Sequence, residues 1–142
     1  MKKIALYISI VCTVVFVQAC KKGGSDPTPT NNTTTNQDLL NTWKVSQVLE
    51  GSLDITGEFT QYRITFAESN GQKTFTLVDR QGTSTNGTWT ISTNNTTITL
   101  SLSDSNSITL NGVSINASQL KYTADEQGKT GAVNLSFTLV PA

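Results

Sequence analysis

The chain has 142 residues, with 10 basic and 10 acidic side chains, two cysteines and no histidine. Without histidine it lacks the usual general base of nucleophilic catalysis and the imidazole ligands of zinc and haem sites. Its balanced charge provides no basic surface for nucleic acid. We therefore expect no enzyme, no metal site, no cofactor and no nucleic-acid partner.

The first nineteen residues have the pattern of a secretion signal. Met1-Lys2-Lys3 is a short basic start, and the fourteen residues 4–17 carry no charge. This run is too short for a membrane-spanning helix, which needs about 20 apolar residues. We expect a signal peptide over 1–19.

Val17-Gln18-Ala19-Cys20 follows this run and resembles the lipobox of bacterial lipoproteins. The resemblance implies cleavage before Cys20, a diacylglycerol thioether on its sulfur and an N-linked acyl chain such as palmitate. Two or more acyl chains anchor a protein stably at a membrane. The alternative is an ordinary signal peptide followed by a chance cysteine.

Residues 20–37 are expected to be a flexible linker that starts at the lipidated cysteine. Residues 21–37 contain no aliphatic or aromatic side chain, so they have nothing to bury that would offset the entropy of ordering. The expected location is the cell envelope, in the outer membrane, on its periplasmic face or at the cell surface. Surface-exposed members of the lipoproteins that this motif resembles often carry acidic residues just after the cysteine, and residues 21–25 contain none, so the resemblance favours the periplasmic face.

The segment 38–142 is predicted to be one domain of β-strands. Apolar residues recur at every second position in runs separated by short polar segments, which is typical of strands with one buried face. The runs are Trp43/Val45, Tyr62/Ile64/Phe66, Phe75/Leu77, Trp89/Ile91, Ile98/Leu100/Leu102, Ile108/Leu110, Val113/Ile115, Leu120/Tyr122 and Val133/Leu135/Phe137/Leu139.

Turn signals separate these runs and set the topology. They include Ser69-Asn70-Gly71, Asn86-Gly87, Asn94-Asn95, Asp104-Ser105-Asn106, Asn111-Gly112 and Glu126-Gln127-Gly128. Strands at this spacing predict an all-β fold, a single antiparallel up-and-down barrel of about eight strands, with one helical turn at 37–40 before it. The domain has no cysteine, so its core alone must hold it together.

Two stretches carry a family resemblance. Leu39–Val45 and Gly87–Ile91, the latter followed by Ile98–Leu100, resemble the opening and the middle of small lipocalin-like domains found in Bacteroidetes lipoproteins. The resemblance implies an extracytoplasmic, lipid-anchored, eight-stranded barrel. For most members of that group it implies no activity.

Five aromatic residues are candidates for a ligand site because they alternate in phase with the core. They are Trp43, Tyr62, Phe75, Trp89 and Phe137. They either line a cavity that holds a small apolar or sugar ligand, or fill the barrel themselves. In the second case the protein is a structural or interaction module that contacts another envelope protein or a glycan.

Phe59 is out of phase with the strand that follows it. Either a bulge turns it inward, or it forms an apolar contact rim with Leu53 and Ile55. Two carboxylate pairs, Asp54 with Glu58 and Asp125 with Glu126, lie in predicted polar connections and are expected to be solvated charges rather than catalytic groups or calcium ligands. Arg63 and Arg80 are expected to be surface charges, with an anion site as the alternative.

Overall fold

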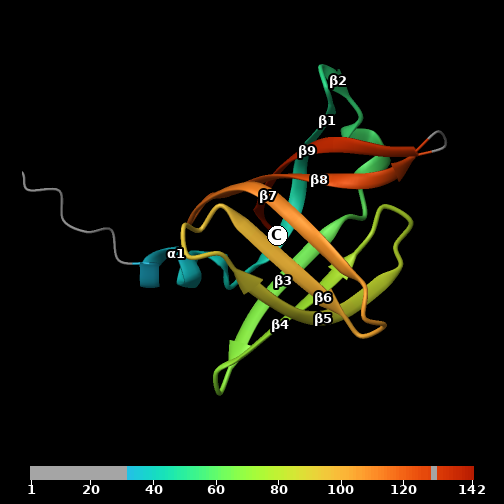
Figure 1. Cartoon of the computed structure of the whole chain (residues 1–142). Coiled ribbons are helices and arrows are strands. Elements are labelled where there is room, and N and C mark those ends of the chain that lie inside the picture. Colours follow the sequence, from blue (N-terminus) through green and yellow to red (C-terminus); the bar gives the residue numbers. More distant parts are fainter. Residues whose placement is uncertain (1–31, 129–130) are drawn as a thin grey trace, which may run out of the picture. The chain divides into compact units, whose positions relative to one another are not determined.

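Antiparallel hairpins make up most of the described chain, which comprises residues 32–128 and 131–142 of this computed structural model. The predicted signal peptide, Cys20 and the linker up to residue 31 lie outside these residues. Figure 1 shows the elements: α1 (Asn32–Leu39), β1 (Thr42–Glu50), β2 (Leu53–Asp54), the 3-10 helix η1 (Thr56–Phe59), β3 (Arg63–Ser69), β4 (Gln72–Val78), β5 (Ser84–Ile91), β6 (Thr97–Leu102), β7 (Ser107–Asn116), β8 (Gln119–Gly128) and β9 (Gly131–Pro141).

The strands close into a barrel. Each strand from β3 to β8 pairs with the next strand along the chain, β1 pairs with β3, and β9 returns to pair with β1 from Trp43 to Glu50. The two-residue strand β2 adds only to the end of β1, so eight strands form the wall. The predicted all-β up-and-down barrel of about eight strands is confirmed.

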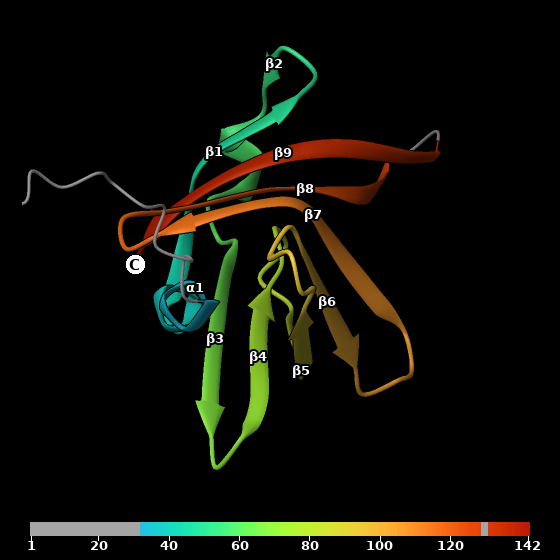
Figure 2. The same cartoon turned by 60° about the vertical axis from the view of Figure 1, so that its left-hand side comes forward.

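We call the end of the barrel at which β1, β4, β6 and β8 end the mouth. At this end, the hydrogen-bonded pairing between neighbouring strands is incomplete. β1 pairs with β3 only over Thr42–Lys44. The β7–β8 ladder stops at Asn111 and Thr123, before either strand reaches the mouth. Figure 2 shows β8 and β9 running in a different direction from β6 and the first half of β7. Near the mouth the wall is therefore open between β7 and β8, whereas on the β1 side Ile55 and Thr56 hydrogen-bond to Val48 in place of β3.

The bend in β7 comes from a bulge at Asn111-Gly112, where the sequence predicted a turn. Gly112 has a φ of 60°, in the left-handed region that is free of steric cost only without a Cβ. The register with β8 shifts between Asn111 and Ser114, and the Val113 N–H donates instead to the carbonyl of Thr96 at 2.9 Å. The turn prediction is wrong here because one extra residue in a continuous strand takes up the positive φ.

The interior of the barrel is one continuous hydrophobic core. The predicted alternation is confirmed, since residues that alternate along the strands are buried on one face. Every aromatic side chain of residues 38–142 belongs to this core: Trp43, Phe59, Tyr62, Phe66, Phe75, Trp89, Tyr122 and Phe137. An eight-stranded barrel is just wide enough for side chains or one small ligand. Here side chains occupy it.

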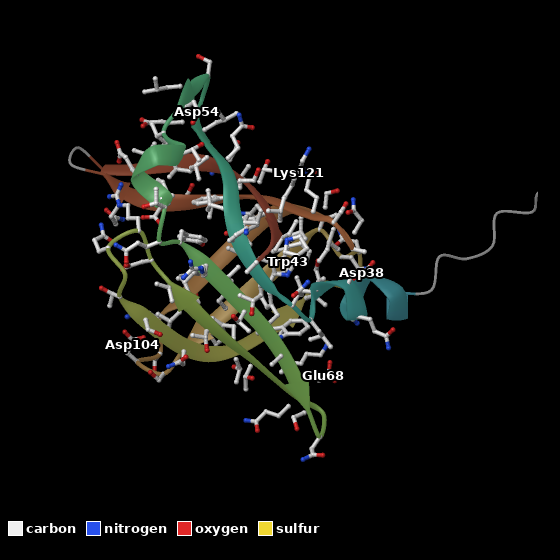
Figure 3. All side chains as sticks on the ribbon, turned by 180° about the vertical axis from the view of Figure 1, so that it is seen from behind. Asp38, Trp43, Asp54, Glu68, Asp104 and Lys121 are labelled. Atoms are coloured by element: carbon white, nitrogen blue, oxygen red, sulfur yellow. The ribbon has the colours of Figure 1, made fainter. Side chains whose placement is uncertain are left out.

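Helix α1 lies at the end opposite the mouth. Its last residue, Leu39, is fully buried, and the Leu39 carbonyl accepts a hydrogen bond from the indole N–H of Trp43 at 3.0 Å. Figure 3 shows Trp43 inside the barrel and Asp38 on the helix beside it. The helix has eight residues where the sequence predicted one turn, and it begins within the predicted linker. In the described part of the chain, no helix has the length and apolarity needed to cross a membrane.

Gly87 marks a close approach between neighbouring strands. The sequence predicted a turn at Asn86-Gly87, but both residues lie within β5. A Cβ on Gly87 would collide with the carbonyl oxygen of Ser101 and would lie 2.8 Å from a ring carbon of Phe75. The turn prediction is wrong because packing, and not chain reversal, requires this glycine.

Replacing this glycine should therefore strain the barrel. We expect Gly87→Ala to lower the free energy of unfolding by about 1–3 kcal/mol, the usual cost of overpacking a core. Urea unfolding followed by tryptophan fluorescence measures it. Gly57→Ala in η1 is the control, because a Cβ there meets nothing within 4 Å. Equal unfolding midpoints for the two variants would contradict the close approach.

Candidate binding site at the barrel mouth

The five predicted ligand-lining residues all point inward, where they form part of the packed core. Trp43, Tyr62, Phe75, Trp89 and Phe137 are each at most 5% exposed. The ring of Phe137 stacks on Tyr62 at a centroid distance of 5.2 Å and on Tyr122 at 5.0 Å. None of the five lines either of the two cavities described below. Their inward position is confirmed, and a role in ligand binding stays a prediction.

Two tyrosine hydroxyls meet inside this core. The hydroxyl oxygens of Tyr62 and Tyr122 lie 2.9 Å apart, and both residues are buried. Burial disfavours the phenolate and raises the pKa of both tyrosines well above the ordinary value. These hydroxyls therefore stay protonated and act as neutral hydrogen-bonding groups.

Phe59 belongs to the core and not to a rim. It ends η1 and is fully buried. Its ring packs edge-on against Phe137 at 5.5 Å and against Tyr62 at 6.0 Å. Of the two alternatives for Phe59, the inward position is confirmed, although a turn of 3-10 helix and not a bulge produces it, and the rim of three apolar residues is wrong. Of its other two members, Leu53 is 62% exposed at the β1–β2 hairpin and Ile55 is partly buried.

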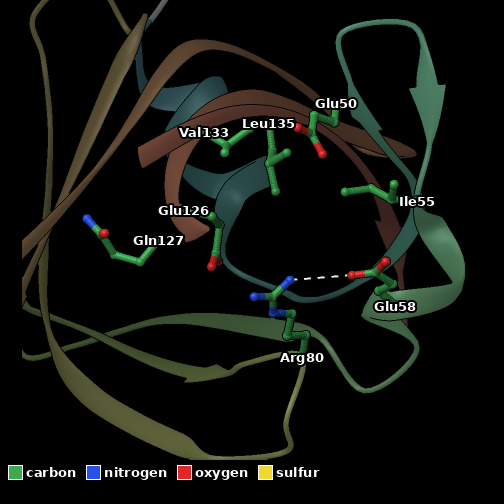
Figure 4. A pocket seen from close by; sticks show the side chains of 8 residues that line it. All are labelled: Glu50, Ile55, Glu58, Arg80, Glu126, Gln127, Val133 and Leu135. Atoms are coloured by element: carbon green, nitrogen blue, oxygen red, sulfur yellow. Dashed lines mark hydrogen bonds and ion pairs between the residues drawn. The ribbon is translucent and has the colours of Figure 1, made fainter. Parts of the chain in front are cut away.

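A cavity of about 80 Å³ lies at the mouth, next to η1 (Figure 4). Ile55, Val133 and Leu135 provide its aliphatic surface. Its polar groups are the amide of Gln127, the guanidinium of Arg80 and three carboxylates, those of Glu50, Glu58 and Glu126. Ligand pockets for drug-sized molecules are typically about 300–1,000 Å³. This cavity has room for one functional group of a ligand, with the rest of the ligand outside.

Arg80 organises the charges at this cavity. Its guanidinium lies 3.5 Å from a carboxylate oxygen of Glu58 and 5.6 Å from the ring centre of Phe59. Figure 4 shows it between Glu58 and Glu126. Arg80 is held in the β4–β5 turn, where the Asp79 carboxylate accepts hydrogen bonds from the backbone N–H of Gln81 and of Thr83. The predicted surface position of Arg80 is correct only in part, because the residue lines the mouth, whereas Arg63 is exposed on β3.

Glu126 points into the barrel, although the sequence predicted it in a polar connection. β8 extends through Glu126, whose cross-strand neighbour is Val133, while Asp125 lies opposite Asn134. The inward positions of β8 are Leu120, Tyr122, Ala124 and Glu126. Continuing the alternation from Leu120 would have found this carboxylate. The prediction of a connection is wrong because the strand pairs with β9 up to the last described residue before the turn.

Partial burial has a cost for this carboxylate. Burial raises the pKa of Glu126, the positive charge of Arg80 opposes that shift, and the negative charge of Asp79 adds to it. With all groups ionised, three carboxylates face one guanidinium, so the cavity has an excess of negative charge. A positively charged group entering it would restore the balance.

Asp54, the remaining carboxylate of the two pairs considered from the sequence, has a structural role. The Asp54 carboxylate accepts hydrogen bonds from the hydroxyl of Thr56 at 2.6 Å and from the Thr56 N–H at 2.9 Å, which lowers the pKa of Asp54. The Thr56 hydroxyl in turn accepts the N–H of Val48. Within residues 32–128 and 131–142, no three acidic side chains lie close enough together to hold a metal ion.

Comparison with known protein families identifies the family of this domain. Residues 27–122 match the profile of a family described as a lipocalin-like domain. The match runs from the segment before α1 to the first residues of β8. No curated protein matches the chain. The mouth residues contributed by the end of β8 and by β9 lie beyond the matched segment.

The tyrosine pair allows a test of the core. We expect Tyr62→Phe to destabilise the protein by about 1–3 kcal/mol, because it leaves the buried hydroxyl of Tyr122 without its partner. The double variant with Tyr122→Phe should recover most of that loss, since both polar groups are then gone. Urea unfolding of the two single variants and the double variant measures this coupling. Additive losses would contradict the hydrogen bond.

Proposed function

Since the chain belongs to the lipocalin-like domain family, we propose that it is a binding module which recognises its ligand at the barrel mouth. In this proposal the barrel interior is a filled core, as in the second interpretation of the sequence. Such barrels typically bind and do not catalyse, and their ligands enter through the mouth. The ligand end group that suits this mouth is small and positively charged, for example an alkylammonium or a guanidinium.

The packing of the interior supports recognition at the mouth, and argues against a barrel that carries an apolar molecule inside. Phe59, Tyr62, Tyr122 and Phe137 form a cluster of ring contacts. A ligand among the five predicted aromatic residues would have to displace side chains that are packed in a continuous core. Removing a buried aromatic contact costs several kcal/mol, which the binding of a small ligand would have to offset.

The charges at the mouth carry the proposal. Three carboxylates and one guanidinium surround a cavity whose walls are aliphatic. An alkylammonium group would place its charge among the carboxylates and its first carbons against Ile55, Val133 and Leu135. A sugar fits this mouth less well than an alkylammonium group, because Trp43 and Trp89, the two tryptophans on which a sugar could stack, are buried in the core.

Titration of small cations tests this function. We expect n-propylammonium to shift the backbone amide NMR signals of Glu126, Gln127 and Val133 in the full-length chain in detergent micelles. Glu126→Gln should weaken binding about fivefold, corresponding to ~1 kcal/mol for a partly solvated ion pair. Binding should also weaken as the pH falls through the raised pKa of Glu126, because protonation removes its charge.

Matched probes and a matched variant make the result specific. Glu68→Gln removes an exposed carboxylate on β3 that does not line the cavity, so it should leave the affinity unchanged. The neutral n-butanol and the anion butyrate should not produce the same shifts. Saturable binding of an apolar probe, with shifts of the NMR signals of the aromatic core, would contradict recognition at the mouth and favour a carrier that holds its ligand inside the barrel.

We further propose that the chain is a lipoprotein of the cell envelope, anchored through Cys20. The support is the lipobox-like Val17-Gln18-Ala19-Cys20 after an uncharged run, and a following segment without aliphatic or aromatic side chains. Two or more acyl chains would hold the module at the outer membrane without a spanning helix. Its ligand or protein partner would then be a component of the envelope.

Mass spectrometry and fractionation test the anchor. In cells of a bacterial host, we expect the mature chain to begin at Cys20 and to carry diacylglycerol and an acyl chain. Cys20→Ser should move the protein from the membrane fraction to the soluble fraction or leave its signal uncleaved. Cys12→Ser is the control, because Cys12 lies within the predicted signal peptide. An unacylated Cys20 in the membrane fraction would rule out this anchor.

A further inference from the structure

A second feature near the mouth is a groove in the barrel wall. It lies between the first half of β7 and the second half of β8, which run apart in Figures 1 and 2. In this region β7 pairs only with β6, over 107–111, and β8 pairs only with β9, over 124–128. A cavity of about 260 Å³ follows the open edge, and it is lined by Ser107, Ile108, Thr109, Asn111 and Asp125.

The groove is a consequence of the bulge at Gly112. Up to Asn111, β7 follows β6, and from Ser114 onwards it follows β8. A positive φ at Gly112 makes that change of direction possible. The two strand edges then diverge towards the mouth. Among residues 32–128 and 131–142, the edge of each strand that faces the groove has no partner strand over this short stretch.

A strand edge without a partner strand can be matched by a ligand with a regular row of backbone donors and acceptors. In an antiparallel sheet, alternate residues direct their backbone N–H and C=O groups to one side, so each open edge presents a regular row of donors and acceptors. The matching ligand is another polypeptide in the extended conformation, as in recognition by strand addition.

The side chains on the two faces of this edge specify the sequence of that polypeptide. On the inner face lie Ile108, Leu110 and Ala124, which are buried or partly buried, and the partly buried Glu126 follows on the same face of β8 towards the mouth. On the outer face lie the hydroxyl and amide side chains and one charged group, Asp125. An added strand would therefore need apolar side chains facing inward, alternating with polar or basic side chains facing outward near Asp125.

We propose that the open edge between β7 and β8 is a docking site for an extended segment of a partner protein, with alternating apolar and basic or hydroxyl side chains. The proposal goes beyond ligand recognition at the mouth, because the groove and the mouth cavity share no lining residue. The two can be tested separately.

Disulfide formation tests whether the edge is open. If the β7–β8 ladder continued towards the mouth past the pair Asn111–Thr123, the next pair of the same type would be Thr109–Asp125. In full-length chain with Cys12→Ser and Cys20→Ser, we expect the Asn111→Cys/Thr123→Cys pair to oxidise. The Thr109→Cys/Asp125→Cys pair should stay reduced, since a disulfide needs Cα atoms within about 7 Å. Ready oxidation of the second pair would show a closed wall and overturn the proposal.

A designed peptide tests docking. The probe is a capped six-residue peptide in which valine alternates with lysine and threonine. We expect it to shift, and to protect from hydrogen exchange, amides in 107–111 and 124–125 of the full-length chain in detergent micelles, which are not part of the readout at the mouth cavity. The same peptide with every backbone amide N-methylated should bind at least about tenfold more weakly, because strand addition depends on main-chain hydrogen bonds.

Charge variants and controls complete the test. Asp125→Asn should weaken the lysine peptide several-fold, whereas Glu68→Gln should not, because Glu68 lies outside the groove. Equal binding of the N-methylated peptide, or shifts at Glu126 and Gln127 without shifts in 107–111, would overturn the proposal. Concentration-dependent dimerisation with the same shifts and no peptide would replace the partner segment by a second copy and also overturn it.

Discussion

The width of an eight-stranded barrel is the constraint on which the rest of the structure depends. Such a barrel encloses space for side chains or for one small ligand, but not for both. In this protein eight aromatic rings and the aliphatic residues between them occupy that space. Space for a ligand or partner in the described structure is therefore found at the ends and edges of the strands. The mouth cavity and the wall groove are both of this kind.

The filled core also explains why polar groups gather where they do. The inward positions of β8 pass from Leu120 through Tyr122 and Ala124 to Glu126, so the same strand face changes from the centre of the core to the solvent boundary. In the core, a polar group needs a partner, and Tyr62 supplies one for Tyr122. At the boundary, a carboxylate is tolerated with a raised pKa and with Arg80 nearby.

Two glycines shape the wall in different ways, and the local sequence does not distinguish them. Gly87 allows three strands to approach closely, and Gly112 takes up a positive φ that redirects a strand. Both follow asparagine, so both resemble hairpin turns in sequence. The atoms that distinguish them come from residues distant in the sequence. For Gly87 they belong to Ser101 on β6 and Phe75 on β4, and for the residue after Gly112 to Thr96 in the β5–β6 connection.

The sequence alone determined the fold class and the interior face of almost every strand. Alternation is a local property, because each side chain points away from those of its chain neighbours, and Ile98, Leu100 and Leu110 are buried as it predicted. It also determined that no imidazole or thiol chemistry occurs in 38–142. The tertiary structure decided which residues share a layer of the barrel. Closure brought Tyr62 to Tyr122 across 60 positions and placed Glu58, Arg80 and Glu126 around one cavity, while the 3-10 turn η1 rotated Phe59 inward. These neighbours depend on the stagger between strands and on one bulge, and neither leaves a periodic signal along the chain.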